Sequence, residues 1–155
     1  MPSLNAGTMR RLVEAARVAR LATVDAGGVP HLVPVCFVLD GERGEGLDRD
    51  GAGGDRVYLA VDHKPKRGPE LRRTANLRAT GRACLLVDRY DEDWSQLWWV
   101  RLDGRGGQVS DPAEASRAVD ALAAKYPQYR ADRPDGPVLR IEVEAYRGWS
   151  ATALS

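Results

Sequence analysis

Apolar side chains recur along the chain with two periods, one typical of helices and one typical of strands. Between residues 8 and 18 they return every three or four positions, which predicts an amphipathic helix with Thr8 placed to cap it. The same spacing predicts helices over residues 69–78 and 111–126. Runs rich in β-branched and aromatic residues predict strands at residues 20–24, 30–39, 57–61, 83–87, 97–102 and 138–143, the last ending near Trp149.

The connections between these strands indicate how the sheet is built. Residues 25–28 and 88–93 are short polar segments that read as turns, so successive strands run antiparallel. Pro30 and Pro34 have no amide hydrogen for a ladder, which places them at a strand start, an edge or a bulge. We therefore predict a mainly antiparallel sheet closed as a barrel, with flanking helices, rather than a parallel doubly wound sheet.

Residues 41–55 interrupt this pattern. They contain six glycines among charged residues and almost no apolar side chain, so they cannot bury enough surface to order themselves. We predict a flexible loop between two strands. The glycines at 51, 53 and 54 are not followed by Lys and Ser or Thr, so this segment is not a phosphate-binding loop of the nucleotide-binding kind.

Length and charge narrow the class of protein. The chain has 155 residues, 43% of them hydrophobic and 29% charged, which fits one globular domain over residues 1–155. A formal charge of +1 offers no overall field for nucleic acid or a membrane surface, so a small-molecule ligand is favoured. We see no leader segment and no run of membrane-spanning length, and we expect a cytoplasmic protein.

Metal binding and nucleophilic catalysis have little support. Cys36 and Cys84 lie in apolar runs, which is typical of buried free thiols, and no histidine cluster accompanies them as in a zinc site. The carboxylates of residues 88–93 lack calcium-loop spacing and read as an exposed turn. We predict no metal and identify no catalytic residue. The candidates for a proton donor are Tyr58, Tyr126 and His31.

The most informative segment is residues 62–67, with the sequence Asp-His-Lys-Pro-Lys-Arg. The chain has 20 arginines and 3 lysines, and two of those lysines lie here, directly after the strand predicted at 57–61. Cations at a strand end suit a phosphate group, because lysine acts as a point charge and arginine as a bidentate donor. Taken by the spacing alone, a solvated basic loop is an equally good interpretation.

The pair Trp98 and Trp99 also indicates a binding surface. Neighbouring side chains on a strand point to opposite faces, so the two indoles cannot enter the same core. One of them must face a ligand, a partner chain or solvent, and plain packing explains at least the other. Arg101 is close enough in sequence for a cation–π contact with either.

Taken together, these motifs resemble a known family. The segments that carry the resemblance are residues 20–24, 28–37, 61–67, 85–95 and 97–101. The chain resembles the pyridoxamine 5'-phosphate oxidase-like split β-barrel proteins, and within them the branch of coenzyme F420-dependent (deazaflavin) oxidoreductases. The resemblance implies an FMN-binding-type split barrel and a homodimer with two cofactor sites at its interface.

The resemblance also assigns roles to individual positions. A cofactor phosphate would be held by Lys64, Lys66 and Arg67. The groove for the cofactor ring would be lined by Ala22, Thr23, Pro34, Val35, Ala60 and Val61. The partner chain would contribute one of Trp98 and Trp99, together with Arg101.

The choice of cofactor depends on the group attached beyond the phosphate. FMN and coenzyme F420 both have a planar tricycle and a phosphate, but F420 continues into a chain of carboxylates. Arginines at 67, 72, 73 and 78 would suit that chain, at about 0.2–1 kcal/mol for each exposed contact. We therefore expect hydride transfer between reduced F420 and a small conjugated organic acceptor. The alternatives are an FMN-dependent oxidoreductase and a non-enzymatic protein that binds a flavin or a tetrapyrrole.

Overall fold

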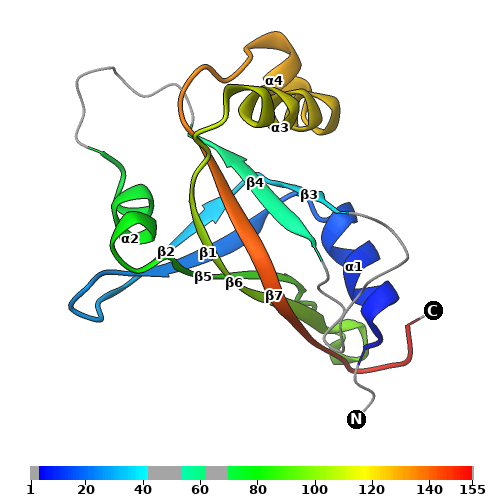
Figure 1. Ribbon diagram of the computed structural model, residues 1–155. Helices are drawn as coiled ribbons and strands as arrows, with labels where there is room; N and C mark the ends of the chain where they lie inside the picture. The colour runs from blue at the N-terminus through cyan, green and yellow to red at the C-terminus, as the bar shows by residue number, and fades with distance from the viewer. Residues whose placement is uncertain (1–3, 42–53, 62–69, 155) are drawn as a thin grey trace.

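The computed structural model describes residues 4–41, 54–61 and 70–154 and consists of one curled sheet with helices around it (Figure 1). The strands are β1 (Ala19–Val24), β2 (Pro30–Val35), β3 (Val38–Asp40), β4 (Arg56–Ala60), β5 (Arg82–Arg89), β6 (Trp98–Gln108) and β7 (Val138–Ser150). The helices are α1 (Ala6–Ala15), α2 (Arg72–Thr80), α3 (Pro112–Lys125) and α4 (Pro127–Ala131), with a short 3-10 helix η1 (Trp94–Gln96).

The sheet confirms the predicted fold class. Its strand order is β2-β1-β5-β6-β7-β4-β3, and each of its ladders is antiparallel. The two edge strands, β2 and β3, follow one another in the chain, so the short segment between them connects the two edges of the curled sheet. Pro30 and Pro34 lie on the edge strand β2, where their missing amide hydrogens leave no ladder bond unmade.

The prediction of one strand over residues 30–39 was wrong, because the chain changes partners at Cys36 and Phe37. Up to Val35 it pairs with β1, and from Val38 it pairs with β4. Phe37 is fully buried, and its amide donates to the hydroxyl of Tyr126 at 3.1 Å. A side chain from a distant helix end therefore replaces the ladder bond at this position.

Strand β6 continues to Gln108, six residues past its predicted end. The prediction stopped there because glycines weaken a strand signal. At Gly104 a Cβ would lie 2.1 Å from the carbonyl oxygen of Glu142, and at Gly106 it would lie 2.4 Å from that of Arg140. The glycines thus permit a close backbone approach to β7, next to the irregularity between Asp103 and Gly104.

Two helix predictions needed correction, and one helix was missed. Helix α1 is capped by Asn5, whose side chain accepts from the Thr8 amide at 2.8 Å, so Thr8 lies inside the first turn. Helix α2 begins at Arg72 and ends at Thr80, and Gly81, with a φ of 71°, forms a left-handed C-cap after it. Helix α4 is too short to leave a periodic signal in the sequence.

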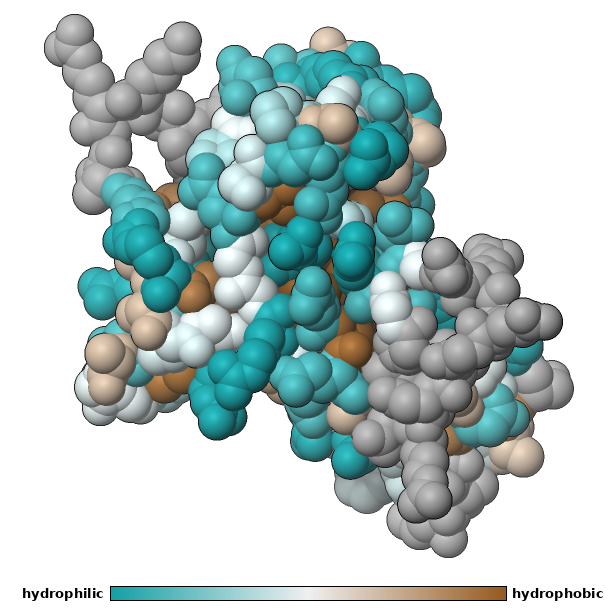
Figure 2. All heavy atoms as spheres, viewed as in Figure 1, coloured by the Kyte–Doolittle hydropathy of each residue, from teal (hydrophilic) through white to brown (hydrophobic). Residues whose placement is uncertain are grey.

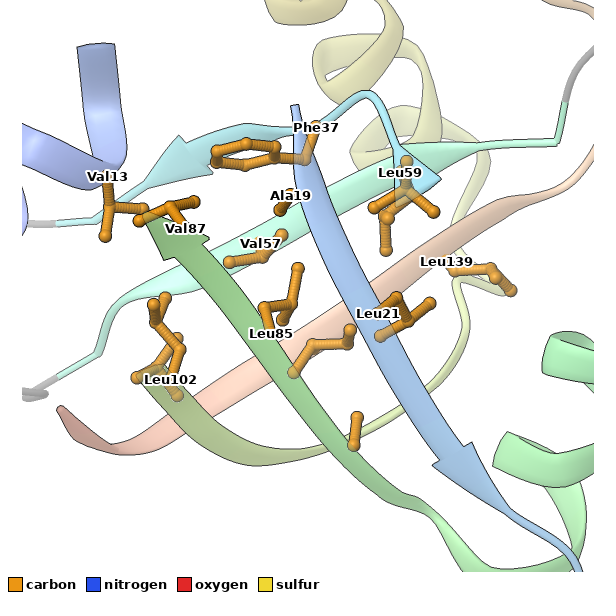
Figure 3. Close-up of a cluster of buried hydrophobic side chains, with 14 of the residues drawn as sticks. Val13, Ala19, Leu21, Phe37, Val57, Leu59, Leu85, Val87, Leu102 and Leu139 are labelled. Atoms are coloured by element: carbon orange, nitrogen blue, oxygen red, sulfur yellow. The ribbon is translucent and has the colours of Figure 1, made fainter. Parts of the chain in front are cut away.

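The core lies on the concave side of the sheet and is shown in Figure 3. Inward positions of the strands alternate with outward ones, so Leu21, Leu85 and Leu102 meet there with the fully buried Phe37. Helix α1 adds Val13 to this cluster. Helix α3 covers the opposite face of β4 and the first part of β7, where a second apolar cluster forms beneath it.

Two expectations about buried and exposed positions were wrong. Cys36 is exposed and Cys84 half-buried, because Cys84 takes the outward position between Ala83 and Leu85 on β5. Asp55, the last residue of the predicted flexible loop, is 1% exposed. Its carboxylate accepts from Arg10 at 3.0 Å and from the Tyr146 hydroxyl at 2.6 Å, and residues 42–53 lie outside the described residues.

Polar side chains cover most of the surface seen in Figure 2, with small apolar areas between them. Within the described ranges, no helix is long and apolar enough to cross a membrane.

Candidate functional site

The convex side of the sheet has a face without a helix packed on it. We call this the open face and define it by the outward side chains of β2, β1, β5, β6 and the last part of β7. Each of them is half-buried or exposed, whereas their inward neighbours are mostly buried. The open face comprises Arg20, Ala22, Leu32, Cys84, Leu86, Trp99, Arg101, Asp103 and Trp149.

At one end of the open face is a groove of about 450 Å³, which we call the tryptophan groove. As the alternation predicted, Trp98 packs against the main core while Trp99 stands on the open face. Trp99 pairs directly with Trp149 across β6 and β7. The groove is lined by Leu86, Asp88, Arg89, Tyr90, Leu97, Trp98, Trp99, Arg101 and Trp149.

A second groove, of about 650 Å³, lies further along the same strands and includes two of the predicted ring-lining residues, Ala22 and Thr23. The Thr23 hydroxyl accepts from the Asn76 amide at 3.1 Å. Cys84 also lines this groove. Burial, together with the hydrogen bond to Asp103, raises the pKa of its thiol to about 11, so it stays protonated at neutral pH and is a poor nucleophile.

A third groove, of about 230 Å³, contains Pro34, Val35 and Ala60, and we call it the Ala60 groove. The structure thus brings together three of the six predicted ring-lining residues. Arg73 and Tyr129 complete its polar side. Val61 is buried, and its amide donates to the Pro137 carbonyl at 2.9 Å.

Arg73 differs from the other arginines of α2. It is half-buried in the Ala60 groove and has no hydrogen-bonding or ion-pair partner within the described part of the chain. Arg72 and Arg78 line a different groove beside Asp25 and Glu70, and Arg78 pairs with Glu70. Of the three described arginines expected near the cofactor tail, only Arg73 lies in a groove with predicted ring-lining residues.

The predicted phosphate ligands Lys64, Lys66 and Arg67 lie outside the described residues. The last described residue before them is Val61, one position after Ala60 of the Ala60 groove. Their role stays a prediction.

The candidate proton donors have other partners or face the interior. Tyr58 donates to Glu114 at 2.7 Å beneath α3, and burial raises the pKa of its hydroxyl. Tyr126 contacts the backbone of Arg17 and Phe37. His31 Nδ1 is buried and has no hydrogen-bonding partner among the described residues.

Lys125 is a residue that the sequence analysis did not single out. Its ammonium donates to the Phe37 carbonyl at 2.9 Å and lies 4.0 Å from the Phe37 ring centroid. Burial, and then the charge of Arg17, lower its pKa to about 8. Lys125 fixes the turn between β2 and β3, and thereby Cys36 at the Ala60 groove. Its rarity, as the third lysine of the chain, was the available signal.

Trp149 and Tyr90 of the tryptophan groove were also missed. The sequence places Trp149 in the last strand, but its pairing with Trp99 depends on a register that the sequence does not show. Within the described residues, no three His, Cys, Asp or Glu side chains gather as a group that could hold a metal ion.

Comparison with known proteins identifies the family. The family model described as "Pyridoxamine 5'-phosphate oxidase" matches residues 6–150. The chain therefore belongs to the pyridoxamine 5'-phosphate oxidase family, as its sequence motifs suggested.

Similar proteins include one curated relative and many solved structures. A 5a,11a-dehydrotetracycline/5a,11a-dehydrooxytetracycline reductase of Streptomyces rimosus is 44% identical over 75 residues, which cover 41% of this chain and 53% of the relative. The match thus spans about half of the relative's length. A conserved hypothetical protein of Mycobacterium tuberculosis has a TM-score of 0.68 at 19% identity, covering 98% of this chain and 91% of that one. An FAD-binding protein of Mesorhizobium loti has a TM-score of 0.64 at 20% identity, with 95% of each chain covered. These structures support the split-barrel fold.

Proposed function

We propose that the protein is a coenzyme F420-dependent oxidoreductase that transfers a hydride between the reduced deazaflavin and a small conjugated organic acceptor. The observation that carries the proposal is the Ala60 groove, where the half-buried Arg73 has no partner among the described residues. An arginine in an apolar groove suits a ligand with a flat ring and an anionic substituent. The name of the Streptomyces rimosus relative adds support for a reductase.

The residues of the Ala60 groove fit such a cofactor in their chemistry. Pro34, Val35 and Ala60 offer small apolar surfaces for a planar ring, and Arg73 supplies positive charge at the border of the groove. Lys64, Lys66 and Arg67 would hold the phosphate. The groove in one chain, at about 230 Å³, is smaller than typical cofactor pockets, so a second chain would complete it.

A homodimer is part of the proposal. Pro34, Arg20, Leu86 and Arg101 lie in one row across the sheet, three strand spacings or about 14 Å from end to end. Neither Trp99 nor Arg101 is among the residues that line the Ala60 groove of their own chain. Joining two open faces would let these residues reach the cofactor of the partner.

The bound cofactor supplies the hydride chemistry, and the chain supplies position and exclusion of water. The acceptor would gain the hydride, and with it two electrons, at its electrophilic carbon, and afterwards a proton from solvent at the other end of its conjugated bond. An enzyme that uses this cellular cofactor would work in the cytoplasm.

Equilibrium titration with purified F420 and with FMN tests the proposal. We expect binding of F420, and weaker binding of the double variant Lys64→Ala, Lys66→Ala, with its melting temperature in the absence of cofactor almost unchanged. If the protein binds FMN tightly and has no affinity for F420, the proposed cofactor is wrong and FMN takes its place. Binding of either without turnover of any acceptor would favour the non-enzymatic alternative, and loss of the apo fold in the double variant would make the two lysines structural.

A further inference from the structure

The Ala60 groove is lined from two separate parts of the sheet. Pro34 and Val35 come from the edge strand β2, whereas Leu59 and Ala60 come from β4, beside the other edge strand. In the described part of the chain no ladder joins β2 to β4. Hydrogen bonds between strands therefore do not fix the distance across the groove, and contacts from outside the sheet must set it.

The end of helix α3 bridges these two parts. Tyr126, the C-cap of α3, is 6% exposed and belongs to the same apolar cluster as Ala60 and Leu122. Its hydroxyl accepts from the Phe37 amide at 3.1 Å and lies 3.0 Å from the carbonyl oxygens of Arg17 and Phe37. Arg17 lies two positions before β1 and Phe37 two positions after β2. One side chain thus links the β4 side of the groove to the ends of β1 and β2.

Lys125 completes this bridge. A hydroxyl has one hydrogen, so Tyr126 can donate to only one of the two carbonyls at a time. The ammonium of Lys125 donates to the Phe37 carbonyl at 2.9 Å, which leaves the Tyr126 hydrogen for the Arg17 carbonyl. The guanidinium of Arg17 in turn donates to the Lys125 carbonyl at 2.8 Å. Each of the two strand ends is therefore tied to α3 by a donor of its own.

We propose that Lys125 and Tyr126 are positioning residues for the cofactor, which hold the β2 side of the Ala60 groove at the distance from Ala60 that a planar ring requires. The inference rests on the proposed function and adds to it two residues that are not among those lining the groove. A groove that is formed before the cofactor arrives lowers the entropic cost of binding. Loss of either residue should therefore weaken binding without removing a contact to the ring.

The charge of Lys125 strengthens its bond to the Phe37 carbonyl, because charged donors form stronger hydrogen bonds than neutral ones. Burial, and then the charge of Arg17, lower the pKa of Lys125 to about 8, and Cys36 acts in the opposite direction. The third titratable group facing the ammonium is the neighbouring Tyr126, whose ring centroid lies 5.2 Å away. This bond should therefore weaken as the pH rises through about 8.

Titration of matched variants with F420 tests the proposal. At about pH 7, Tyr126→Phe and Lys125→Met should each bind F420 about tenfold more weakly than the wild type. The control is Tyr58→Phe, which removes another buried tyrosine hydroxyl beneath α3 at a position that does not line the groove. This variant should lose stability in urea but bind F420 as the wild type does. If Tyr126→Phe does not fold, Lys125→Met, at a half-buried position, carries the test.

A pH profile separates positioning by the Lys125 ammonium from a simple loss of packing. The ratio of the dissociation constants of Lys125→Met and the wild type should fall from about tenfold at about pH 7 to about threefold or less at about pH 9.5. Titration of the cofactor itself affects both proteins alike and cancels in this ratio.

The outcomes separate this inference from the proposed function. If both variants bind F420 as tightly as the wild type, if Tyr58→Phe weakens binding as much as they do, or if the ratio is the same at both pH values, the positioning role is wrong and the proposed function stands. If the wild type binds FMN alone, the proposed cofactor is wrong, and the same losses measured with FMN would still support the positioning role. A wild-type protein that binds neither cofactor refutes the proposed function and the positioning role together.

Discussion

Strand β7 passes through two very different environments. Its first part lies under α3, where Arg140 and the neighbouring Tyr58 of β4 both donate to Glu114. Its last part lies on the open face, where Trp149 pairs with Trp99 beside a groove. The two regions belong to one continuous ladder, so the difference between them arises from the side chains and from the elements that cover them.

The covered region has its polar groups paired with one another. Glu114 is 9% exposed, with Tyr58 at 2.7 Å and Arg140 at 2.8 Å from its oxygens. Buried polar groups of this kind are tolerated because each has its partner. The polar network thus fixes α3 on the sheet, and its role is structural.

The open region mixes indoles, a thiol and aliphatic side chains with arginines. Leu32 is 68% exposed, although it stands among the half-buried Ala22 and Cys84. This composition costs free energy when it faces water and is typical of a surface that binds a partner or a ligand. The two regions therefore differ in the side chains that face away from the core, and not in the strands that carry them.

The largest effect is expected from a charge in the middle of the open face. Cys84 lies between Ala22 and Asp103 in one row of the sheet, so Cys84→Glu would place a second carboxylate beside Asp103. At a dimer interface, unpaired like charges cost several kcal/mol, and we expect dimerisation to weaken by about 100-fold or more. Sedimentation equilibrium measures this, with Cys84→Ser as the control of equal size. An unchanged dimer would show that the open face is not the interface.

A smaller effect is expected in the covered region. Tyr58→Phe removes a buried hydrogen bond to the carboxylate of Glu114. The free energy of unfolding should fall by about 1.5–3 kcal/mol in urea denaturation. The matched control is Tyr90→Phe beside the tryptophan groove, where the side chain is exposed and no loss is expected. Equal losses from both variants would remove the distinction between the two regions.

Helix α2 offers the same comparison on a smaller scale, since its arginines face different grooves. Arg73→Ala should weaken binding of F420 by about tenfold, which corresponds to about 1.4 kcal/mol. Arg72→Ala, one residue away on the other groove, should bind F420 as the wild type does. Isothermal titration calorimetry distinguishes them, and an equal loss in both would point to a general charge effect.

The smallest effect concerns pH. The hydrogen bond from Tyr58, followed by that from Arg140, lowers the pKa of Glu114 below its ordinary 4.5. Ionised Glu114 therefore stabilises the folded protein fully above about pH 4.5, and this contribution is lost as the pH falls through the lowered pKa. Urea midpoints of the wild type should fall more steeply below pH 4.5 than those of Glu114→Gln. Parallel pH profiles would contradict this role of the carboxylate.

Most elements of the fold were predictable because their signals are local. Runs rich in β-branched and other apolar residues identified β1, β4 and β5, and the prolines of β2 indicated a strand start, an edge or a bulge. The errors occurred where a distant group acts on the backbone. Tyr126 accepts from the amide of Phe37, two residues after β2 ends, and the carbonyls of β7 require the glycines of β6.

The candidate site was predictable only in pieces. The alternation of side chains along a strand showed that Trp98 and Trp99 face opposite sides of the sheet. The role of the basic segment 62–67 after β4 in binding a phosphate stays a prediction. Only the family resemblance placed Pro34, Val35 and Ala60 in one groove, because two of them lie on an edge strand and the third on a strand far along the chain. Contacts between distant strands follow from the register of the whole sheet.

The sequence by itself determined the antiparallel strands, the family and the residue types available for binding, because periodicity and motifs are properties of neighbouring positions. Only the tertiary structure decided that Arg73 faces the Ala60 groove while Arg72 and Arg78 do not, and that Trp149 stands beside Trp99. Those relations depend on helix rotation and strand register, which the packing of the core fixes.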